Sequence, residues 1–346
     1  MGQGTRGRGR PGPGQGVPRG RPGRRGQRAD AGVTATAILF DLLTVAVTFL
    51  IASLAYRPFI ALLQSRRAGQ VIQEELPAEH QRKAGTPTGG GILFVALAIL
   101  GGLLAALAGH PGAFAPVAAL ALGGLVGLAD DLQKLKVGSL GIPARLKFPL
   151  QLLVAVPVAF LAHHGQQWPL PFDLGWWYWP LAVLAIAATA NAVNLTDGID
   201  GLAGGLCAIA FTGLALLLPS ASSGAKAVAM SVVGGLLAFL WYNRHPASVF
   251  MGDAGSLGLG YALAAMAIQQ GFVLLLPLLG LVFVIETLSV MMQVAYFKAT
   301  GGRRVFKMPP IHFTFQLEGW SENRIDAVFW TVGAVAALAS AGAARL

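Results

Sequence analysis

The chain has 346 residues, of which 55% are hydrophobic and only 12% are charged. Soluble domains carry about 25% charged residues, so this composition excludes an ordinary water-soluble protein. The 25 Lys and Arg residues outnumber the 15 Asp and Glu residues and give a formal net charge of +10.

The N-terminal segment differs from the rest of the chain. The first 30 residues contain eight arginines among Gly, Pro and Gln, with no apolar run. Such a composition cannot bury enough apolar surface to fold, so we expect residues 1–33 to form a disordered tail. A basic tail can bind acidic lipid or nucleic acid, but a solvated extension is the simpler interpretation, and we expect no nucleic-acid partner.

Residues 34–346 consist of long apolar blocks. A block of about 20 apolar residues spans a bilayer as a helix, because lipid offers no partner to an unsatisfied backbone group. The sequence therefore predicts one all-α, polytopic integral membrane domain, embedded in the lipid bilayer, with about ten transmembrane helices. The predicted spans are about 36–56, 89–109, 112–129, 147–164, 177–195, 201–219, 225–242, 256–270, 272–297 and 325–344.

Basic residues divide unequally between the two sets of loops. Beyond the tail, 15 of the 17 Lys and Arg residues follow the first, third, fifth, seventh or ninth span. Cytoplasmic loops collect Lys and Arg, so we expect this set to face the cytoplasm. The arginines of the tail argue for the opposite orientation, but four separate loop segments agree, and we follow the loops.

Five aspartates lie at or near the predicted cytoplasmic ends of spans. An ionisable side chain at membrane depth is costly, so each one is a functional hypothesis. Together with the basic loops they predict a site for a metal ion and an anion. They are Asp130, Asp131, Asp197, Asp200 and Asp253.

The stretch "GLADDLQKLKVGSLGIPARLK", residues 127–147, carries the most explicit chemistry. The adjacent carboxylates of Asp130 and Asp131 repel one another and gain from a divalent cation. Magnesium is usually held by one or two carboxylates and by phosphates of a substrate. Lys134 and Lys147 would bind such phosphates as point charges. An ordinary solvated helix end is the alternative interpretation of this motif.

Four further segments carry polar residues between apolar ones. "NAVNLTDGIDG", residues 191–201, is predicted to be a cytoplasmic turn whose polar groups face a ligand. In "NRHPASVFMGDAGS", glycines around Asp253 allow close approach of a ligand, and Ser256 is expected to cap the next helix. Glu286 either hydrogen bonds to a partner such as Gln293 or contacts substrate. Pro309 and Pro310 stiffen the segment of His312.

These motifs occur in a fixed order that resembles the phospho-N-acetylmuramoyl-pentapeptide transferase family of bacterial cell-wall synthesis, over about residues 36–344. The resemblance implies ten helices, periplasmic termini, a homodimer and an active site on the cytoplasmic side of the bacterial inner membrane. It implies transfer of phospho-MurNAc-pentapeptide from UDP-MurNAc-pentapeptide to undecaprenyl phosphate, which gives lipid I and UMP, with Mg²⁺. The motifs are "KAGTPTGGG", "LADD", "NAVNLTDGIDGLAGG", "NRHPASVFMGDAGSLGLG", "ETLSVMMQVAYFK" and "FKMPPIH…GWSE".

The resemblance also implies roles for individual residues. Asp130 and Asp131 match the paired aspartates, with Asp130 as the base for the lipid phosphate. Asp253 matches the magnesium ligand, and His312 matches the first histidine of a catalytic loop. Substrate-binding roles fall on Lys83, Lys134, Lys147, Asn194, Asp197, Asp200, Asn243, Phe250, Gly252 and Ser256.

The chain departs from the family pattern in the loop that usually reads "PIHHHFE". Here the sequence is "PIHFTFQ", so Phe313 and Thr314 replace two histidines and Gln316 replaces the glutamate. The lost residues were either auxiliary, or the sugar-peptide end of the substrate differs. The triple glycine at 89–91 also replaces the more usual "MGG". None of these changes affects the three aspartates Asp130, Asp131 and Asp253.

Three other functions are compatible with parts of the sequence. A sister enzyme would transfer GlcNAc-phosphate or another sugar phosphate to the same lipid, but "FKMPPIH…GWSE" and "ETLSVMMQ" favour the MurNAc-pentapeptide transferase. A transporter would be expected to show internal repeats and binding residues at the bilayer midplane, and neither is evident. A non-catalytic relative is disfavoured by the intact aspartates.

Overall fold

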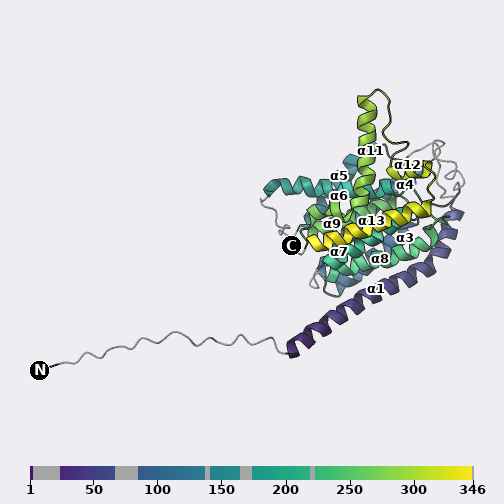
Figure 1. The fold of residues 1–346 in the computed structure, drawn as a ribbon. Helices are drawn as coiled ribbons and strands as arrows, with labels where there is room; N and C mark the ends of the chain where they lie inside the picture. Colours follow the sequence, from purple (N-terminus) through teal and green to yellow (C-terminus); the bar gives the residue numbers. More distant parts are fainter. Residues whose placement is uncertain (3–23, 67–84, 137–140, 164–173, 219–222, 345–346) are drawn as a thin grey trace. The chain divides into compact units, whose positions relative to one another are not determined.

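The structure is a computed structural model that describes residues 1–2, 24–66, 85–136, 141–163, 174–218 and 223–344 (Figure 1). The described residues form helices and turns and contain no β-strand. The fold is therefore the all-α membrane fold that the apolar blocks predict. Lys83, one of the predicted substrate-binding residues, lies outside the described residues.

The chain divides into two units, Met1–Phe40 and Asp41–Leu346. Helix α1 covers Arg24–Ser65, so residues 24–33 are helical although the sequence predicted a disordered tail there. The physical reason is the absence of proline between Pro22 and Pro58, which lets the helix continue back from the apolar span. The remainder of the predicted tail, residues 3–23, lies outside the described residues.

The second unit contains the helices that carry the predicted site. Seven helical segments of the described chain are long and apolar enough to cross a membrane, and α3 and α7 are shorter apolar helices. After α1, the helices are α3 (Gly91–Leu107), α4 (Phe114–Lys134), α5 (Ala144–Ala162), α6 (Tyr178–Thr196), α7 (Leu202–Leu217), α8 (Ser223–Asn243), α9 (Asp253–Gln269), α10 (Leu276–Leu279), α11 (Leu281–Ala299), α12 (Ile311–Leu317) and α13 (Glu322–Ala343).

Large apolar side chains are exposed on several of these helices. Leu153 and Phe160 on α5 and Leu338 on α13 are 68%, 61% and 67% exposed. A soluble protein rarely exposes apolar surface on this scale, whereas a bilayer solvates it. The exposed leucines and phenylalanines therefore support a multi-pass membrane protein.

Helix α9 differs from the others because all 17 of its residues are buried. Its neighbours approach closely at glycines. A Cβ atom on Gly127 of α4 would lie 2.1 Å from the Asp253 carbonyl oxygen, and one on Gly91 of α3 would lie 2.4 Å from the Gly255 Cα atom. On the α6 side, a Cβ on Gly260 would lie 2.3 Å from the Ala190 Cα. Small residues at these contacts let the helices pack backbone to backbone.

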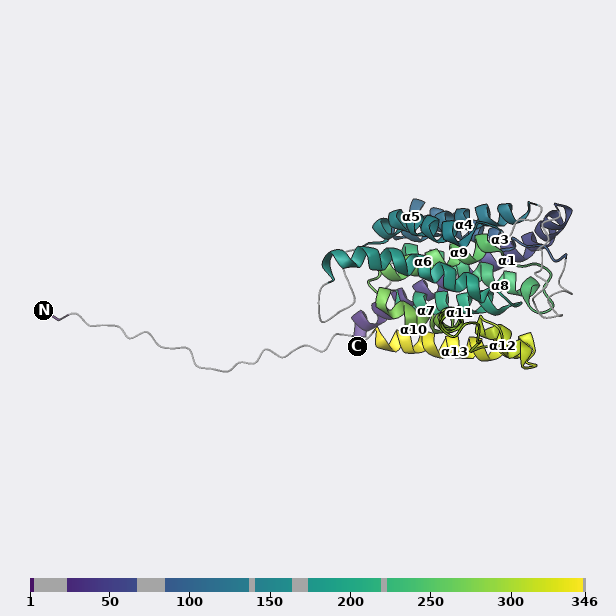
Figure 2. The ribbon, with the colours of Figure 1, turned by 90° about the horizontal axis from the view of Figure 1, so that it is seen from above.

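The predicted ninth span is not continuous. Instead of one helix over 272–297, the chain forms a 3₁₀ turn at Val273–Leu275, the short α10 and then α11. Pro277 lies at the start of α10 and Gly280 separates the two helices, so both residues interrupt regular hydrogen bonding. Figure 1 shows α11 projecting away from the neighbouring helices, and Figure 2 shows it end on.

Candidate active site

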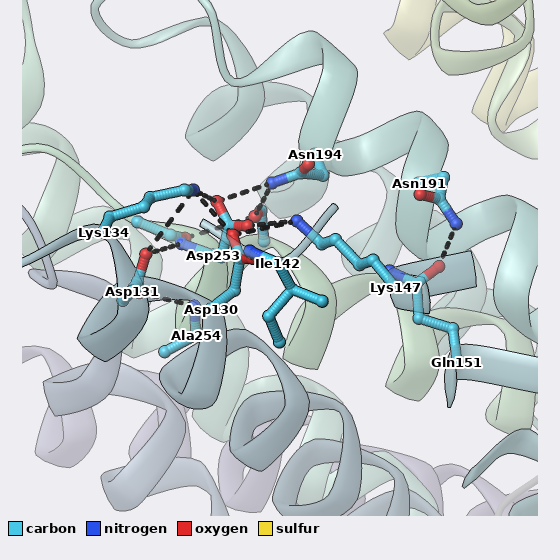
Figure 3. Close-up of polar contacts among 12 residues, drawn as sticks. Asp130, Asp131, Lys134, Ile142, Lys147, Gln151, Asn191, Asn194, Asp253 and Ala254 are labelled. Carbon is cyan, nitrogen blue, oxygen red and sulfur yellow. Dashed lines mark hydrogen bonds and ion pairs between the residues drawn. The ribbon is translucent and has the colours of Figure 1, made fainter. Parts of the chain in front are cut away.

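The predicted paired aspartates meet the third aspartate where α4 ends and α9 begins (Figure 3). Asp130 and Asp131 occupy the last turns of α4, and Asp253 is the first residue of α9. All three are buried, with 1%, 8% and 6% of their surface exposed. Three buried carboxylates in one group require positive charge or protons nearby.

Asp131 holds the start of α9 in place. Its Oδ1 accepts a hydrogen bond from the Asp253 backbone N–H at 3.0 Å, and its Oδ2 accepts one from the Ala254 N–H at 3.0 Å. The first N–H groups of a helix have no partner within the helix, so a carboxylate there acts as a cap. Asp131 therefore positions Asp253.

The other two aspartates are bridged by two lysines. Lys134 Nζ lies 2.9 Å from Asp130 Oδ2 and 2.8 Å from Asp253 Oδ1. Lys147 Nζ lies 3.2 Å from Asp130 Oδ2 and also donates to Asp253 Oδ2. Each ammonium group therefore contacts carboxylates from both α4 and α9. Both lysines were predicted from the sequence, but their bridging position was not.

Asn194 approaches the same group from α6. Its Nδ2 donates to Asp253 Oδ1 at 3.1 Å and to Ser256 Oγ at 2.9 Å. Ser256 is buried in the first turn of α9, and its hydroxyl donates to the Gly252 carbonyl. The expectation that Ser256 caps this helix is wrong, because α9 begins at Asp253 and Asp131 provides the cap.

The segment before α9 runs beside the residues that lead into α3. The Phe250 N–H donates to the Pro87 carbonyl at 2.8 Å, and the Gly90 N–H donates to the Phe250 carbonyl at 2.8 Å. Gly252 has a φ of 79°, which a residue with a side chain rarely adopts. A Cβ at this position would also lie 2.9 Å from Asp131 Oδ2, so glycine is required beside the aspartates.

The turn predicted at residues 191–201 is shorter in the structure, because residues 191–196 continue α6 and only 197–201 connect α6 to α7. Asp200 in this turn is buried and accepts hydrogen bonds at Oδ2 from the Ala247 N–H and from His245 Nδ1. Asn243 Oδ1 accepts from the Gly201 N–H. The contacts of Asp200 and Asn243 therefore connect the turn to the segment after α8, and neither residue directly contacts Asp130, Asp131 or Asp253 through these bonds.

His312 lies at the start of α12 and is fully buried. Its Nδ1 lies 3.1 Å from Glu286 Oε2 of α11. Its Nε2 lies against the 197–201 turn, since a Cβ on Gly198 would be 2.3 Å away from it. Glu286 therefore lies at ion-pair distance from His312, although neither side chain makes a hydrogen bond among the described residues, and its contact with substrate stays a prediction. Gln293, the partner suggested for Glu286, instead accepts hydrogen bonds from Val305 and Phe306.

The two residues that replace family histidines have structural contacts. Thr314 Oγ1 donates to the Met308 carbonyl at 2.7 Å, which closes the segment before α12. Phe313 is buried and its ring lies 4.2 Å from the His312 ring, centroid to centroid. Gln316 Nε2 donates to Glu322 Oε1 at 3.0 Å. The side chains of Phe313, Thr314 and Gln316 therefore make contacts that hold the segment around His312 in place.

Three polar groups near the site were missed from the sequence. His245 and Glu322 contact Asp200, and Gln151 accepts a hydrogen bond from Asn191. His245 lies in "NRHPASVFMGDAGS" and Glu322 in "GWSE", so both were within motifs that the sequence singled out. Gln151 is fully buried in α5, and nothing in its sequence neighbourhood distinguishes it from a solvated residue.

The donor set at Asp130 and Asp253 fits a divalent cation. Carboxylate oxygens are the ligands that magnesium prefers, and these two side chains already share positively charged partners. Lys134 and Lys147 would be free to contact phosphate if a metal took over the neutralisation of the carboxylates. The arrangement is suited to stabilising charge on a phosphoryl group.

Asp197 gives a pH-dependent prediction. Burial raises its pKa from the ordinary 3.8 to about 8, and the carboxylates of Asp253 and Asp131 add to the rise. The unfolded chain ionises this group near pH 4, so the folded protein loses stability as the pH rises from about 4 to about 8 and loses no more above that. We expect Asp197→Asn to raise the melting temperature increasingly between pH 5 and pH 8, by about 2 °C or more at pH 8.

Thermal unfolding in detergent at several pH values measures this difference. Glu318→Gln, which removes an exposed carboxylate that pairs with Lys307, is the matched control. A difference between Asp197→Asn and the unmodified protein that stays constant across this pH range would contradict the raised pKa of Asp197.

Comparison with known proteins agrees with the geometry. A family model described as glycosyl transferase family 4 matches residues 113–271, which include α4, α6 and the start of α9. A phospho-N-acetylmuramoyl-pentapeptide-transferase of Geobacillus thermodenitrificans is 44% identical over 317 residues, which cover 86% of this chain and 95% of the relative.

Two further relatives carry the same name. The protein of Desulforamulus reducens is 43% identical over 304 residues, covering 83% of this chain and 91% of the relative. That of Listeria monocytogenes is 40% identical over 311 residues, covering 86% and 96%. Identity of this degree over nearly the whole length establishes kinship, and the chain belongs to the phospho-N-acetylmuramoyl-pentapeptide-transferase family.

Proposed function

We propose that the protein transfers phospho-MurNAc-pentapeptide from UDP-MurNAc-pentapeptide to undecaprenyl phosphate, releasing UMP and forming lipid I for peptidoglycan synthesis. The observation that carries the proposal is the bridge that Lys134 and Lys147 make between Asp130 and Asp253. It places two ammonium groups and two carboxylates within a few ångströms, in a chain whose relatives are named for this transfer. That combination supports the binding of a diphosphate together with a metal ion.

In the proposed reaction, an oxygen of the lipid phosphate attacks the phosphorus attached to the sugar. The bond between that phosphorus and the oxygen bridging to UMP breaks, and UMP leaves with the bonding electrons. Asp130 accepts the proton of the lipid phosphate, and Lys134 and Lys147 contact the phosphate oxygens. Bound Mg²⁺, held by Asp253, would neutralise charge that develops on the transferred group.

The remaining residues hold the nucleotide-sugar in this proposal. Asn194 fixes the orientation of Asp253. The turn at 197–201, which carries Asp197 and Asp200, would contact the nucleotide-sugar. Phe250 and Gly252 lie on the segment that leads into α9, beside the residues that precede α3. Lys83, which lies outside the described residues, would contact the nucleotide in this proposal.

We further propose that the site faces the cytoplasm of a bacterial inner membrane and that two copies of the chain form a homodimer. The distribution of Lys and Arg along the sequence supports the orientation, because 15 of the 17 basic residues beyond the tail fall in the set of predicted loops that also carries the aspartates. A cytoplasmic site would receive the soluble nucleotide-sugar from water and the polyprenyl phosphate from the bilayer.

Release of UMP by the purified protein tests the reaction. The assay contains Mg²⁺, undecaprenyl phosphate and UDP-MurNAc-pentapeptide, with UDP-GlcNAc as the competing donor. We expect UMP from the pentapeptide donor alone, and none when Mg²⁺ is removed with a chelator. Release with UDP-GlcNAc alone would overturn the proposal and direct attention to Phe313 and Thr314 as specificity determinants.

A further inference from the structure

A second group of metal-ligating side chains lies outside the cluster at Asp253. It consists of Asp200, His245 and Glu322, whose ligand atoms all lie within 4.8 Å of one another. His245 Nδ1 is 3.1 Å from Asp200 Oδ2 and 3.3 Å from Glu322 Oε2. We propose that these three residues bind a transition-metal ion of the zinc type, which ties three separate segments of the chain together.

The spacing of the ligand atoms favours a small tetrahedral ion. Zinc holds nitrogen and oxygen ligands at about 2.0–2.1 Å, so neighbouring ligand atoms of a tetrahedral site lie about 3.3–3.4 Å apart. The two separations from His245 Nδ1, 3.1 Å and 3.3 Å, need little adjustment to reach that spacing, and all the ligand atoms lie within 4.8 Å of one another. Zinc accepts imidazole nitrogen and carboxylate oxygen together, whereas magnesium prefers oxygen alone.

Hydrogen bonds outside the three ligand atoms fix the carboxylates in position. Gln316 Nε2 donates to Glu322 Oε1, and the Asp200 backbone N–H donates to Glu322 Oε2. The Ala247 N–H donates to Asp200 Oδ2. Outer hydrogen bonds of this kind orient metal ligands.

Burial differs among the three residues in a way that suits metal entry. The side chains of Asp200 and Glu322 are 1% exposed, whereas that of His245 is 37% exposed. Two buried carboxylates at this separation need a positive charge, which either a protonated His245 or a metal ion supplies. The exposed edge of the imidazole leaves a path for the ion and a place for a water molecule as fourth ligand.

The segments that meet at this cluster explain what a metal would do there. Asp200 belongs to the turn that contains Asp197, His245 follows α8, and Glu322 is the first residue of α13. A shared ion would fix the turn to both of the other segments. The inference concerns how the turn is held, and it assigns the Asp200 carboxylate to the metal ion rather than to direct contact with the nucleotide-sugar.

Zinc binding by the full chain in detergent tests the proposal, with no polyhistidine tag present. The protein is first treated with a chelator and freed of it, and Zn²⁺ is then added in the presence of excess Mg²⁺. We expect about one equivalent of zinc by elemental analysis and a rise in melting temperature of about 3 °C or more. His245→Gln and Glu322→Gln should each lose both the zinc and the rise.

Two control variants separate this cluster from other sites. His110→Gln removes an exposed histidine elsewhere, and Asp253→Asn alters the cluster at the start of α9; both should retain the zinc and the rise in melting temperature. Equal zinc uptake by His245→Gln and by the unmodified protein would overturn the proposal as adventitious binding. Failure of zinc to bind or to raise the melting temperature would also overturn it and leave His245 as the ion-pair partner of the two carboxylates.

Discussion

Replacing Asp253 with Asn will reduce UMP release by at least about a hundredfold, the loss typical of removing one preorganised charged group from a phosphoryl-transfer or acyl-transfer site. The substitution preserves the shape of the side chain and removes its charge. Lys134 and Lys147 would then have Asp130 as their remaining partner among these contacts. The two ammonium groups would no longer be held symmetrically, and the ligand proposed for the metal would be lost.

The elution profile in detergent should stay that of a folded protein in Asp253→Asn, because the Asp131 cap accepts backbone N–H groups and not the side chain of residue 253. The melting temperature should fall, because the substitution removes the buried ion pairs with Lys134 and Lys147. Glu318→Gln, on an exposed part of the chain, provides the matched loss of one carboxylate and should retain full activity. More than about a tenth of the original turnover in Asp253→Asn at saturating Mg²⁺ would contradict the central role of this carboxylate.

The second large effect is expected from a single methyl group. Gly127→Ala places a Cβ atom 2.1 Å from the Asp253 carbonyl oxygen and 2.5 Å from the Ala254 nitrogen, where only backbone can move to make room. Overpacking of this kind costs about 1–3 kcal/mol. Since the displaced backbone carries Asp253, both the stability and the transfer rate should fall, the latter by about tenfold or more.

Gly124→Ala supplies the control on the same helix. A Cβ on Gly124 would meet the Ala254 carbonyl oxygen and a Val95 methyl group at 3.5 Å, which is ordinary contact. Alanine is also favoured over glycine in a helix by about 1 kcal/mol, so this variant should be as stable as the parent or more stable. Equal behaviour of the two variants in thermal unfolding and UMP release would show that α4 and α9 are not closely packed at Gly127.

Sequence reasoning predicts the helical architecture because the bilayer imposes it. Apolar blocks of sufficient length have one solution in lipid, and each predicted span overlaps a helix of the structure. The exception is the interruption at Gly280. A single glycine and a nearby proline are tolerated in many membrane helices, so hydropathy alone does not tell a break from a kink.

The sequence predicts which residues form the candidate site, but not which hydrogen-bond and ion-pair partners each of them has. Asp130, Asp131 and Asp253 meet as expected, because all three belong to helix ends on one side. Whether a carboxylate takes lysine or backbone partners depends on how α4 and α9 dock, and local sequence does not contain that information. For this reason the capping role of Asp131 was not predicted.

The contacts between segments that are distant in the sequence could not be predicted either. His245 and Asp200 are 45 residues apart, and Asp200 and Glu322 are 122 apart. Neither separation corresponds to a helical or strand period, so no pattern connects them. The pairing of Glu286 with His312 was missed for the same reason, although both residues had been considered individually.

The complete burial of α9 also determines which changes that helix can accept. A helix in contact with lipid tolerates a change of volume but resists polarity. In α9 we expect the opposite: a change of side-chain volume should be harmful, and a polar atom with a partner should be tolerated. The reason is that α9 is surrounded by other helices at close backbone distance and not by lipid. Buried Ser256 and Gln269 already show that a polar atom with a partner is admitted there. Sequence variation along α9 should therefore be limited by side-chain size, and variation along the exposed faces of α5 and α13 by hydrophobicity.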